Sequence, residues 1–341
     1  MPSAEENKKK PKLEINAEAQ ESSESENTEK MQEIAEAEME KSENESRKDF
    51  AERMGVSFSK EEMLKSSPRE QADYILESNQ KTAQFSVGSA RSLEEYLPII
   101  AELMENDPEL AISIHVSSPA INAESLSWDN GEKLSRDIQL AAEADCSPIT
   151  IHPGTLPIRE MQKLTEEIQE KILDSLADFY AGNISQTKNS GKVLELAIEN
   201  LPAKGIDGNW GQQPEDLAKI IAKTRQSLVV NFGFKAEEAV AAVGMTLDVN
   251  HALTGLDEEK KAEKLSEWFR ELGQDIKCIH VYTPSDSRDG RDSVNNQLEI
   301  LRRLGDKFNV KPEILLESKK DLETTKGIFD AGRKSILGSL N

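Results

Sequence analysis

The chain has few of the features that mark secreted, membrane-spanning or nucleotide-binding proteins. Its 341 residues include two cysteines, too few for a disulfide framework. No apolar run approaches the roughly 18 residues that a transmembrane helix needs, and the N-terminal MPSAEENKKKPKLE lacks the apolar core of a secretory signal. No GxGxxG or GxxxxGK(S/T) motif follows a candidate strand. We therefore expect a cytoplasmic protein with no membrane partner.

Positive charge is also scarce. The chain carries 64 Asp and Glu against 42 Lys and Arg, a net charge of −22. Such a balance repels phosphate backbones, so a broad surface for nucleic acid or anionic lipid is disfavoured.

Aromatic residues make up only 5% of the chain, and the first fifty residues explain part of this low value. Residues 1–50 hold 15 acidic and 8 basic side chains, a net charge of −7, and Phe50 is their only aromatic. Stretches such as ESSESENTEK bury too little apolar surface to offset the entropy of ordering. We predict a disordered acidic tail over residues 1–50, in which EKMQEIAEAEMEK forms at most a transient helix or a docking helix for a partner.

Residues 51–341 have a size and a pattern that predict an α/β barrel. Helical repeats alternate with eight short apolar runs: DYILES, AQFSV, LAISIH, PITIH, VLELAIE, MTLD, IKCIHV and EILLE. Continuous apolar runs of this kind are typical of parallel strands buried on both faces. Eight β–α units fit a (β/α)8 TIM barrel, although an open doubly wound sheet has the same pattern.

The ends of these runs carry the most informative residues. Six consecutive candidate strands finish on a type of residue that binds metals: His115, His152, Glu199, Asp248, His280 and Glu317. The remaining histidine of the chain, His251, follows Asp248 by three residues. In a barrel the carboxyl ends of the strands meet at one face, where active sites form. We expect these side chains to converge there.

Such a set of side chains predicts a divalent metal site. Glu199, Asp248, His280 and Glu317 offer mixed oxygen and nitrogen ligands, which suit Mn²⁺, Mg²⁺, Co²⁺ or Zn²⁺. His115 and His152 add imidazoles that could hold a second ion, with Glu199 bridging the two. We therefore expect one or two metal ions per chain.

The ordered motifs resemble the xylose isomerase-like TIM barrels, which include sugar phosphate isomerases and epimerases and the endonuclease IV type of abasic-site nuclease. The matching segments are IHVSSPAIN (114–122), IHPGT (151–155), IENLP (198–202), LDVNHA (247–252), IHVYTP (279–284) and LLES (315–318). The resemblance runs from about residue 70 to the end of the chain.

The resemblance implies roles for individual residues. Glu199, Asp248, His280 and Glu317 match the ligands of the catalytic metal, and Glu199 and Glu317 match the acid and base that exchange a substrate proton. His251 matches a histidine that contacts substrate in the epimerases, or a further zinc in the nuclease. The arrangement of His115, Pro119, Asn122 and His152 resembles the first zinc site of the nuclease, and Asn122 is a candidate substrate contact.

The loop after the seventh strand departs from the nuclease pattern. The nuclease has an Asp-x-His pair there, whereas this loop reads SDSRDGRDSVNN and contains no histidine. It instead contains Arg288 and Arg291. These arginines are candidates for binding a substrate; the alternative is that they belong to a solvent-exposed loop.

Three functions follow as hypotheses. The leading one is a metal-dependent isomerase or epimerase acting on a small sugar or sugar phosphate, as a possible homo-oligomer. The second is a zinc-dependent hydrolase that cleaves abasic DNA, which the acidic charge opposes. The third is a barrel without catalysis that interacts through its tail.

Overall fold

The computed structural model describes residues 38–58, 65–87, 92–119, 121–122, 127–128, 130–157, 163–188, 193–202, 207–283, 289–318 and 322–338. Arg47–Asn341 forms one compact unit, which starts four residues before the boundary that composition predicts. Residues 38–52 are helical, and Phe50 and Ala51 are buried. The rest of the predicted tail, residues 1–37, lies outside the described residues. Among the helices that are described, none is long and apolar enough to cross a membrane.

Eight parallel strands close into a barrel, which confirms the predicted (β/α)8 fold. They lie in chain order around it, and the first strand closes against the last through pairs such as Met54 with Ile314. The strands are β1 (Met54–Phe58), β2 (Thr82–Ser86), β3 (Ala111–His115), β6 (Ile149–Ile151), β8 (Leu196–Glu199), β10 (Val243–Asp248), β11 (Ile276–Thr283) and β12 (Glu313–Ser318).

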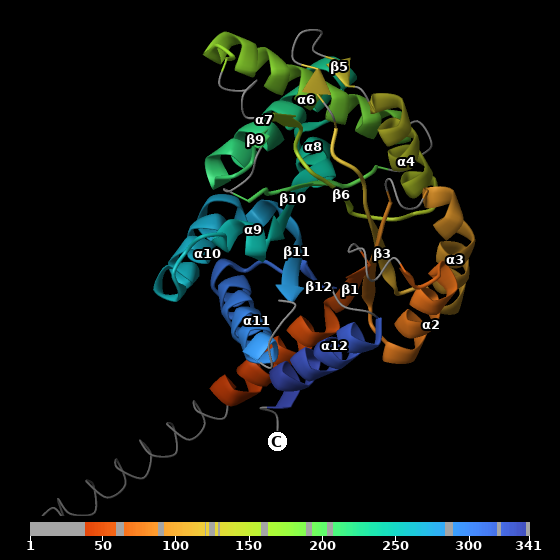
Figure 1. The fold of residues 1–341 in the computed structure, drawn as a ribbon, viewed down its shortest axis with the longest axis vertical. Coiled ribbons are helices and arrows are strands. Elements are labelled where there is room, and N and C mark those ends of the chain that lie inside the picture. The colour runs from red at the N-terminus through yellow and green to blue at the C-terminus, as the bar shows by residue number, and fades with distance from the viewer. Residues whose placement is uncertain are drawn as a thin grey trace, which may run out of the picture. The chain divides into compact units, whose positions relative to one another are not determined.

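Helices form a layer around the strands (Figure 1). They are α2 (Pro68–Ser78), α3 (Leu93–Asn106), α4 (Gly131–Glu143), α6 (Glu166–Lys188), α7 (Pro214–Phe232), α8 (Ala236–Ala242), α9 (Val249–Leu253), α10 (Glu258–Leu272), α11 (Asp289–Phe308) and α12 (Leu322–Leu337), with a 3₁₀ turn at Gly273–Asp275. Two short antiparallel ladders pair β4 (Ile121–Asn122) with β5 (Ser127–Trp128), and β7 (Thr155–Pro157) with β9 (Asp207–Asn209).

The first predicted strand is wrong. DYILES lies at the end of helix α2, and the first strand is MGVSF at Met54–Phe58. Ser67 caps the helix through a reciprocal capping box with Glu70, and Pro68 occupies its first turn. The buried residues Ala72, Tyr74 and Ile75 all lie on the face that packs inward, so DYILES forms part of an amphipathic helix. The other seven predicted strands each overlap a barrel strand.

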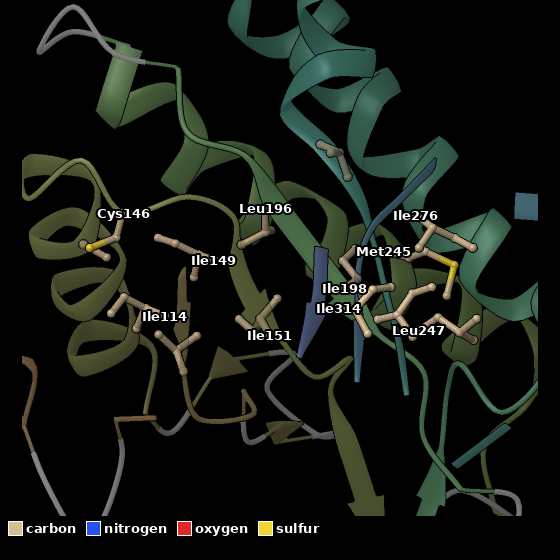
Figure 2. Packing of buried hydrophobic residues seen from close by; sticks show 14 of the residues in the cluster. Ile114, Cys146, Ile149, Ile151, Leu196, Ile198, Met245, Leu247, Ile276 and Ile314 are labelled. Atoms are coloured by element: carbon tan, nitrogen blue, oxygen red, sulfur yellow. The ribbon is translucent and has the colours of Figure 1, made fainter. Parts of the chain in front are cut away.

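The two faces of the barrel wall differ in chemistry. Side chains alternate between faces along a strand, and one face carries the apolar residues that pack beneath the helices. Figure 2 shows this packing for residues such as Ile114, Ile149, Ile198 and Leu247. These apolar side chains point out of the barrel. The residues that alternate with them along each strand therefore point inward, and they are more polar.

A chain of hydrogen bonds crosses the polar interior. Ser57 Oγ donates to Gln84 Oε1 at 2.9 Å, and Gln84 Nε2 donates to Thr150 Oγ1 at 3.2 Å. The hydroxyls of Thr150 and Thr246 lie 2.9 Å apart. All four side chains are fully buried and come from four different strands. Two positions further along a strand, the next inward-facing side chain lies closer to the carboxyl end of the barrel. The polar layer therefore forms the floor of the site described below.

Candidate metal centre

The carboxyl ends of the strands bring seven predicted residues together, as expected. They form three overlapping groups whose potential ligand atoms lie within 4.8 Å of one another in each group: His115, His152 and Glu199; Glu199, Asp248 and His251; and Asp248, His280 and Glu317. These residues span about 200 positions of sequence. Closure of the barrel is what places them side by side.

Glu199 lies at the centre of the cluster. Its Oε2 atom is 2.8 Å from His115 Nε2 and 3.2 Å from His152 Nε2. Its Oε1 atom is 3.6 Å from the Nδ1 atoms of both His251 and His280. One carboxylate with only 2% of its surface exposed therefore faces all four histidines of the chain.

Asp248 and Glu317 complete the acidic side of the cluster. Both are 2% exposed, and His280, between β10 and β12 in the barrel, is fully buried. Glu317 Oε1 is 3.5 Å from His280 Nδ1, and Asp248 Oδ2 is 3.4 Å from His251 Nδ1. Asp248 also caps the short helix α9, because its Oδ1 atom accepts a hydrogen bond from the backbone N–H of His251.

The cluster shifts the protonation of its members. Burial alone would raise the pKa of Glu199, but the charges of His152 and His280 and a hydrogen bond from His115 hold it well below the usual value. Burial raises the pKa of Asp248 to about 6, with the charges of Glu199 and Glu317 adding to the rise and His251 opposing it. Burial would lower the pKa of His280, yet the charges of Glu317 and Glu199 raise it well above its usual value.

The residues present fit a divalent cation. Among the described residues, neither ring nitrogen of His280 has a hydrogen-bond partner, although the ring is fully buried. Buried polar groups normally have partners, and the buried carboxylates of Glu199 and Asp248 beside this ring pair with histidines but with no Lys or Arg among the described residues. A cation coordinated by this donor set would satisfy both.

Further side chains hold the predicted ligands in place. Ser118 Oγ lies 2.8 Å from His152 Nδ1, which leaves His152 Nε2 to face Glu199. Ser57 Oγ lies 3.4 Å from Glu317 Oε1 and ties that carboxylate to the polar layer beneath it. The sequence pattern predicts no role for Ser57 or Ser118. It marks only residues at the carboxyl ends of predicted strands, and neither serine lies at such an end.

Three predicted substrate contacts cannot be placed as side chains. Arg288 lies outside the described residues. Asn122 belongs to β4 and Arg291 to α11, but the structure describes only their backbone. Their roles stay predictions.

Comparison with known proteins gives a likeness in structure and none in sequence. No family model and no curated protein matches the chain. Among solved structures, D-psicose 3-epimerase from Clostridium cellulolyticum H10 is similar over 84% of this chain and 96% of its own, with a TM-score of 0.52 and 10% identity. L-Ribulose 3-epimerase covers 84% of this chain and 94% of its own, with a TM-score of 0.50 and 12% identity.

A third solved structure has a similar barrel. It is a xylose isomerase domain-containing protein from Salmonella typhimurium, similar over 85% of this chain and 98% of its own, with a TM-score of 0.50 and 13% identity. The chain therefore shares the (β/α)8 barrel fold of these three proteins. At these identities the likeness establishes the fold alone, and the chemistry must be argued from the residues.

Proposed function

We propose that the protein is a divalent metal-dependent isomerase or epimerase of a sugar or sugar phosphate. The observation that carries the proposal is the buried set of Glu199, Asp248, His280 and Glu317 at the carboxyl ends of four neighbouring strands. Two proteins with a similar barrel are named as sugar 3-epimerases, which supports the same class of substrate here.

These four residues would hold one metal ion, which would supply Lewis-acid polarisation of a substrate carbonyl. Polarisation acidifies the C–H bond on the neighbouring carbon. One of the carboxylates Glu199 and Glu317 would remove that proton, and the other would return a proton to the opposite face of the same carbon. In the epimerase case, the net reaction inverts one stereocentre and consumes no other reactant.

The histidine and loop residues would orient the substrate. His251 is part-buried at the rim of the cluster, where its ring could accept a hydrogen bond from a hydroxyl group. Asn122, Arg288 and Arg291 are proposed to contact hydroxyl or phosphate oxygens. The guanidinium groups of Arg288 and Arg291 suit phosphate in particular.

A specific observation favours a second candidate. His115, His152 and Glu199 form a group of their own that shares Glu199 with the first. A pair of ions would supply the activation of water that hydrolysis of a phosphodiester, such as abasic DNA, requires. The net charge of −22 and the loop without histidine after β11 oppose this candidate.

The test is removal of metal by chelation and reloading with Mn²⁺, Co²⁺, Mg²⁺ or Zn²⁺ in deuterated water. The reloaded protein is incubated with a panel of ketoses, aldoses and their phosphates, and in parallel with an abasic DNA duplex. Metal-restored deuterium incorporation beside a sugar carbonyl supports the isomerase. Strand cleavage without sugar exchange favours the hydrolase, and protein that binds no metal supports a barrel without catalysis.

A further inference from the structure

Asn200, the residue that follows Glu199, bridges from the end of strand β8 to Asp248 at the end of the neighbouring strand β10. Its Nδ2 atom donates to the backbone carbonyl of Asp248 at 2.9 Å. Its Oδ1 atom accepts from the backbone N–H of the same residue at 2.6 Å. The side chain is fully buried, and both of its polar ends are used.

This bridge extends the barrel ladder beyond the point where the backbones can pair. Strands β8 and β10 end their backbone register at Glu199 and Thr246, and Asn200 N–H still donates to Thr246 O at 3.3 Å. From there the Asn200 amide takes the place of a peptide group and satisfies both backbone polar groups of Asp248. Without it, a buried N–H and a buried C=O beside the carboxylates would lack these partners.

Asn200 also constrains His251 through its backbone. The carbonyl oxygen of Asn200 lies 2.9 Å from His251 Nδ1. Since a carbonyl only accepts, Nδ1 must carry the hydrogen, and in the neutral ring Nε2 keeps the lone pair. The same Nδ1 atom lies 3.4 Å from Asp248 Oδ2 and 3.6 Å from Glu199 Oε1, so this hydrogen bond fixes the His251 ring beside both carboxylates.

We propose that Asn200 is a positioning residue that holds Asp248 in the arrangement that binds the metal and fixes the ring of His251 beside it. It follows one ligand in the chain, clamps the backbone of a second and sets the tautomer of a third side chain. The inference rests on the proposed function only in requiring that the cluster binds a divalent metal, and not on which reaction follows.

The first experiment measures metal binding by Asn200 variants. Asn200→Asp keeps the shape of the side chain but replaces the donor to Asp248 O with a second acceptor, and Asn200→Ser removes the bridge without adding charge. The matched controls are Asn183→Asp and Asn183→Ser, since Asn183 is also buried and its amide donates to Phe179 O within helix α6. Co²⁺ affinity is measured by titration, together with the visible absorption spectrum of the bound ion and the melting temperature of the metal-free protein.

We expect both Asn200 variants to bind Co²⁺ 10–100-fold more weakly than the wild type, with an altered absorption spectrum. The Asn183 variants should lose melting temperature without either change. Affinity within twofold of the wild type and an unchanged spectrum in a folded Asn200 variant would overturn the inference.

A measurement on the wild type keeps the test valid even if the variants do not fold. The chain has four histidines, so their ring nitrogens are readily assigned by ¹⁵N NMR. In the Zn²⁺-loaded protein His251 should be protonated at Nδ1, and a His251 ring protonated at Nε2 alone would contradict the proposal. Weak binding by the Asn200 variants together with no sugar turnover would leave this inference standing and remove the proposed reaction.

Discussion

At the scale of single residues, Glu199 explains most of the behaviour of the candidate centre. It faces all four histidines and is almost fully buried. A buried carboxylate is tolerated only with partners of opposite charge or with a cation. We therefore propose that Glu199 contacts whichever divalent ion or ions the centre would hold.

The carboxylate of Glu317 is expected to be essential for metal binding. Glu317→Gln removes one charged ligand and should weaken Mn²⁺ or Co²⁺ binding by at least tenfold, with turnover lost in parallel. Titration calorimetry measures the affinity. Glu313→Gln is the matched control, since the same change is made at the other end of strand β12. Equal metal affinity in both variants would show that Glu317 is not a ligand.

Glu313 gives a prediction about pH. Burial, with a smaller contribution from the charge of Glu195, raises its pKa to about 7, while a hydrogen bond from Thr82 opposes the rise. A carboxyl group with a raised folded-state pKa favours the fold while it is protonated. Its ionisation therefore costs stability as the pH rises from about 4.5 to about 7.

Glu313→Gln should consequently stabilise the protein at pH 8, by about 1–3 kcal/mol, and change it little at pH 5. Gln keeps an oxygen that can accept from Thr82. Urea unfolding of the wild type and the variant at both pH values, with chelator present, gives the difference directly. A difference that is the same at pH 5 and pH 8 would refute the raised pKa.

At the scale of elements, the sequence predicted seven strands well and one badly. Runs such as PITIH and VLELAIE are short and rich in Ile, Val and Leu, as expected of strands buried in a parallel barrel. DYILES contains the same residue types, but the capping box at Ser67 and Pro68 starts a helix eleven residues long. The strand at MGVSF was not predicted, because it has only five residues and one of them is Gly55.

Gly55 marks the tightest approach between the first two strands. A Cβ atom at this position would collide with the backbone carbonyl of Thr82. Backbone cannot yield as a flexible side chain does, and we expect Gly55→Ala to destabilise the protein by more than 2 kcal/mol in urea unfolding.

Gly327 provides the contrasting variant. It lies inside helix α12, and a Cβ atom there would meet no described atom within 4 Å. Gly327→Ala should stabilise the fold by about 0.5–1 kcal/mol, because alanine has the higher helix propensity. Similar losses of stability in both variants would mean that the strand contact is not the cause.

The polar floor of the barrel could not be predicted from the sequence. Ser57, Gln84, Thr150 and Thr246 are ordinary residues of their segments, and their hydrogen bonds depend on the register between strands. Register follows from closure of the whole barrel, which no single segment encodes. For the same reason the sequence contained Asn200 in IENLP without revealing that its side chain bridges to Asp248.

At the scale of the whole molecule, the convergence of the candidate ligands was predictable because the topology is simple. Parallel strands in chain order put every strand's carboxyl end on one face, so a residue type repeated at those ends had to converge. His115, His152, Glu199, Asp248, His280 and Glu317 were identified in this way, whereas loop residues that lack such a rule could not be positioned.

A metal that binds only the folded protein must also stabilise it. With free Zn²⁺ or Mn²⁺ at about 100 times its dissociation constant, the gain is about 2.7 kcal/mol, and the melting temperature should rise by a few degrees. Chelation should reverse the rise. Differential scanning calorimetry checks this, and Glu199→Gln should show no rise under the same conditions. A rise of the same size in that variant would indicate ions bound elsewhere on the acidic surface.

The most direct test of the central claim is native mass spectrometry of protein reloaded with Mn²⁺, Co²⁺ or Zn²⁺ and exchanged into metal-free buffer. We predict that the wild-type chain retains one or two divalent ions and that Glu199→Gln retains fewer. A wild-type mass equal to that of the chelated protein for every metal would contradict the account.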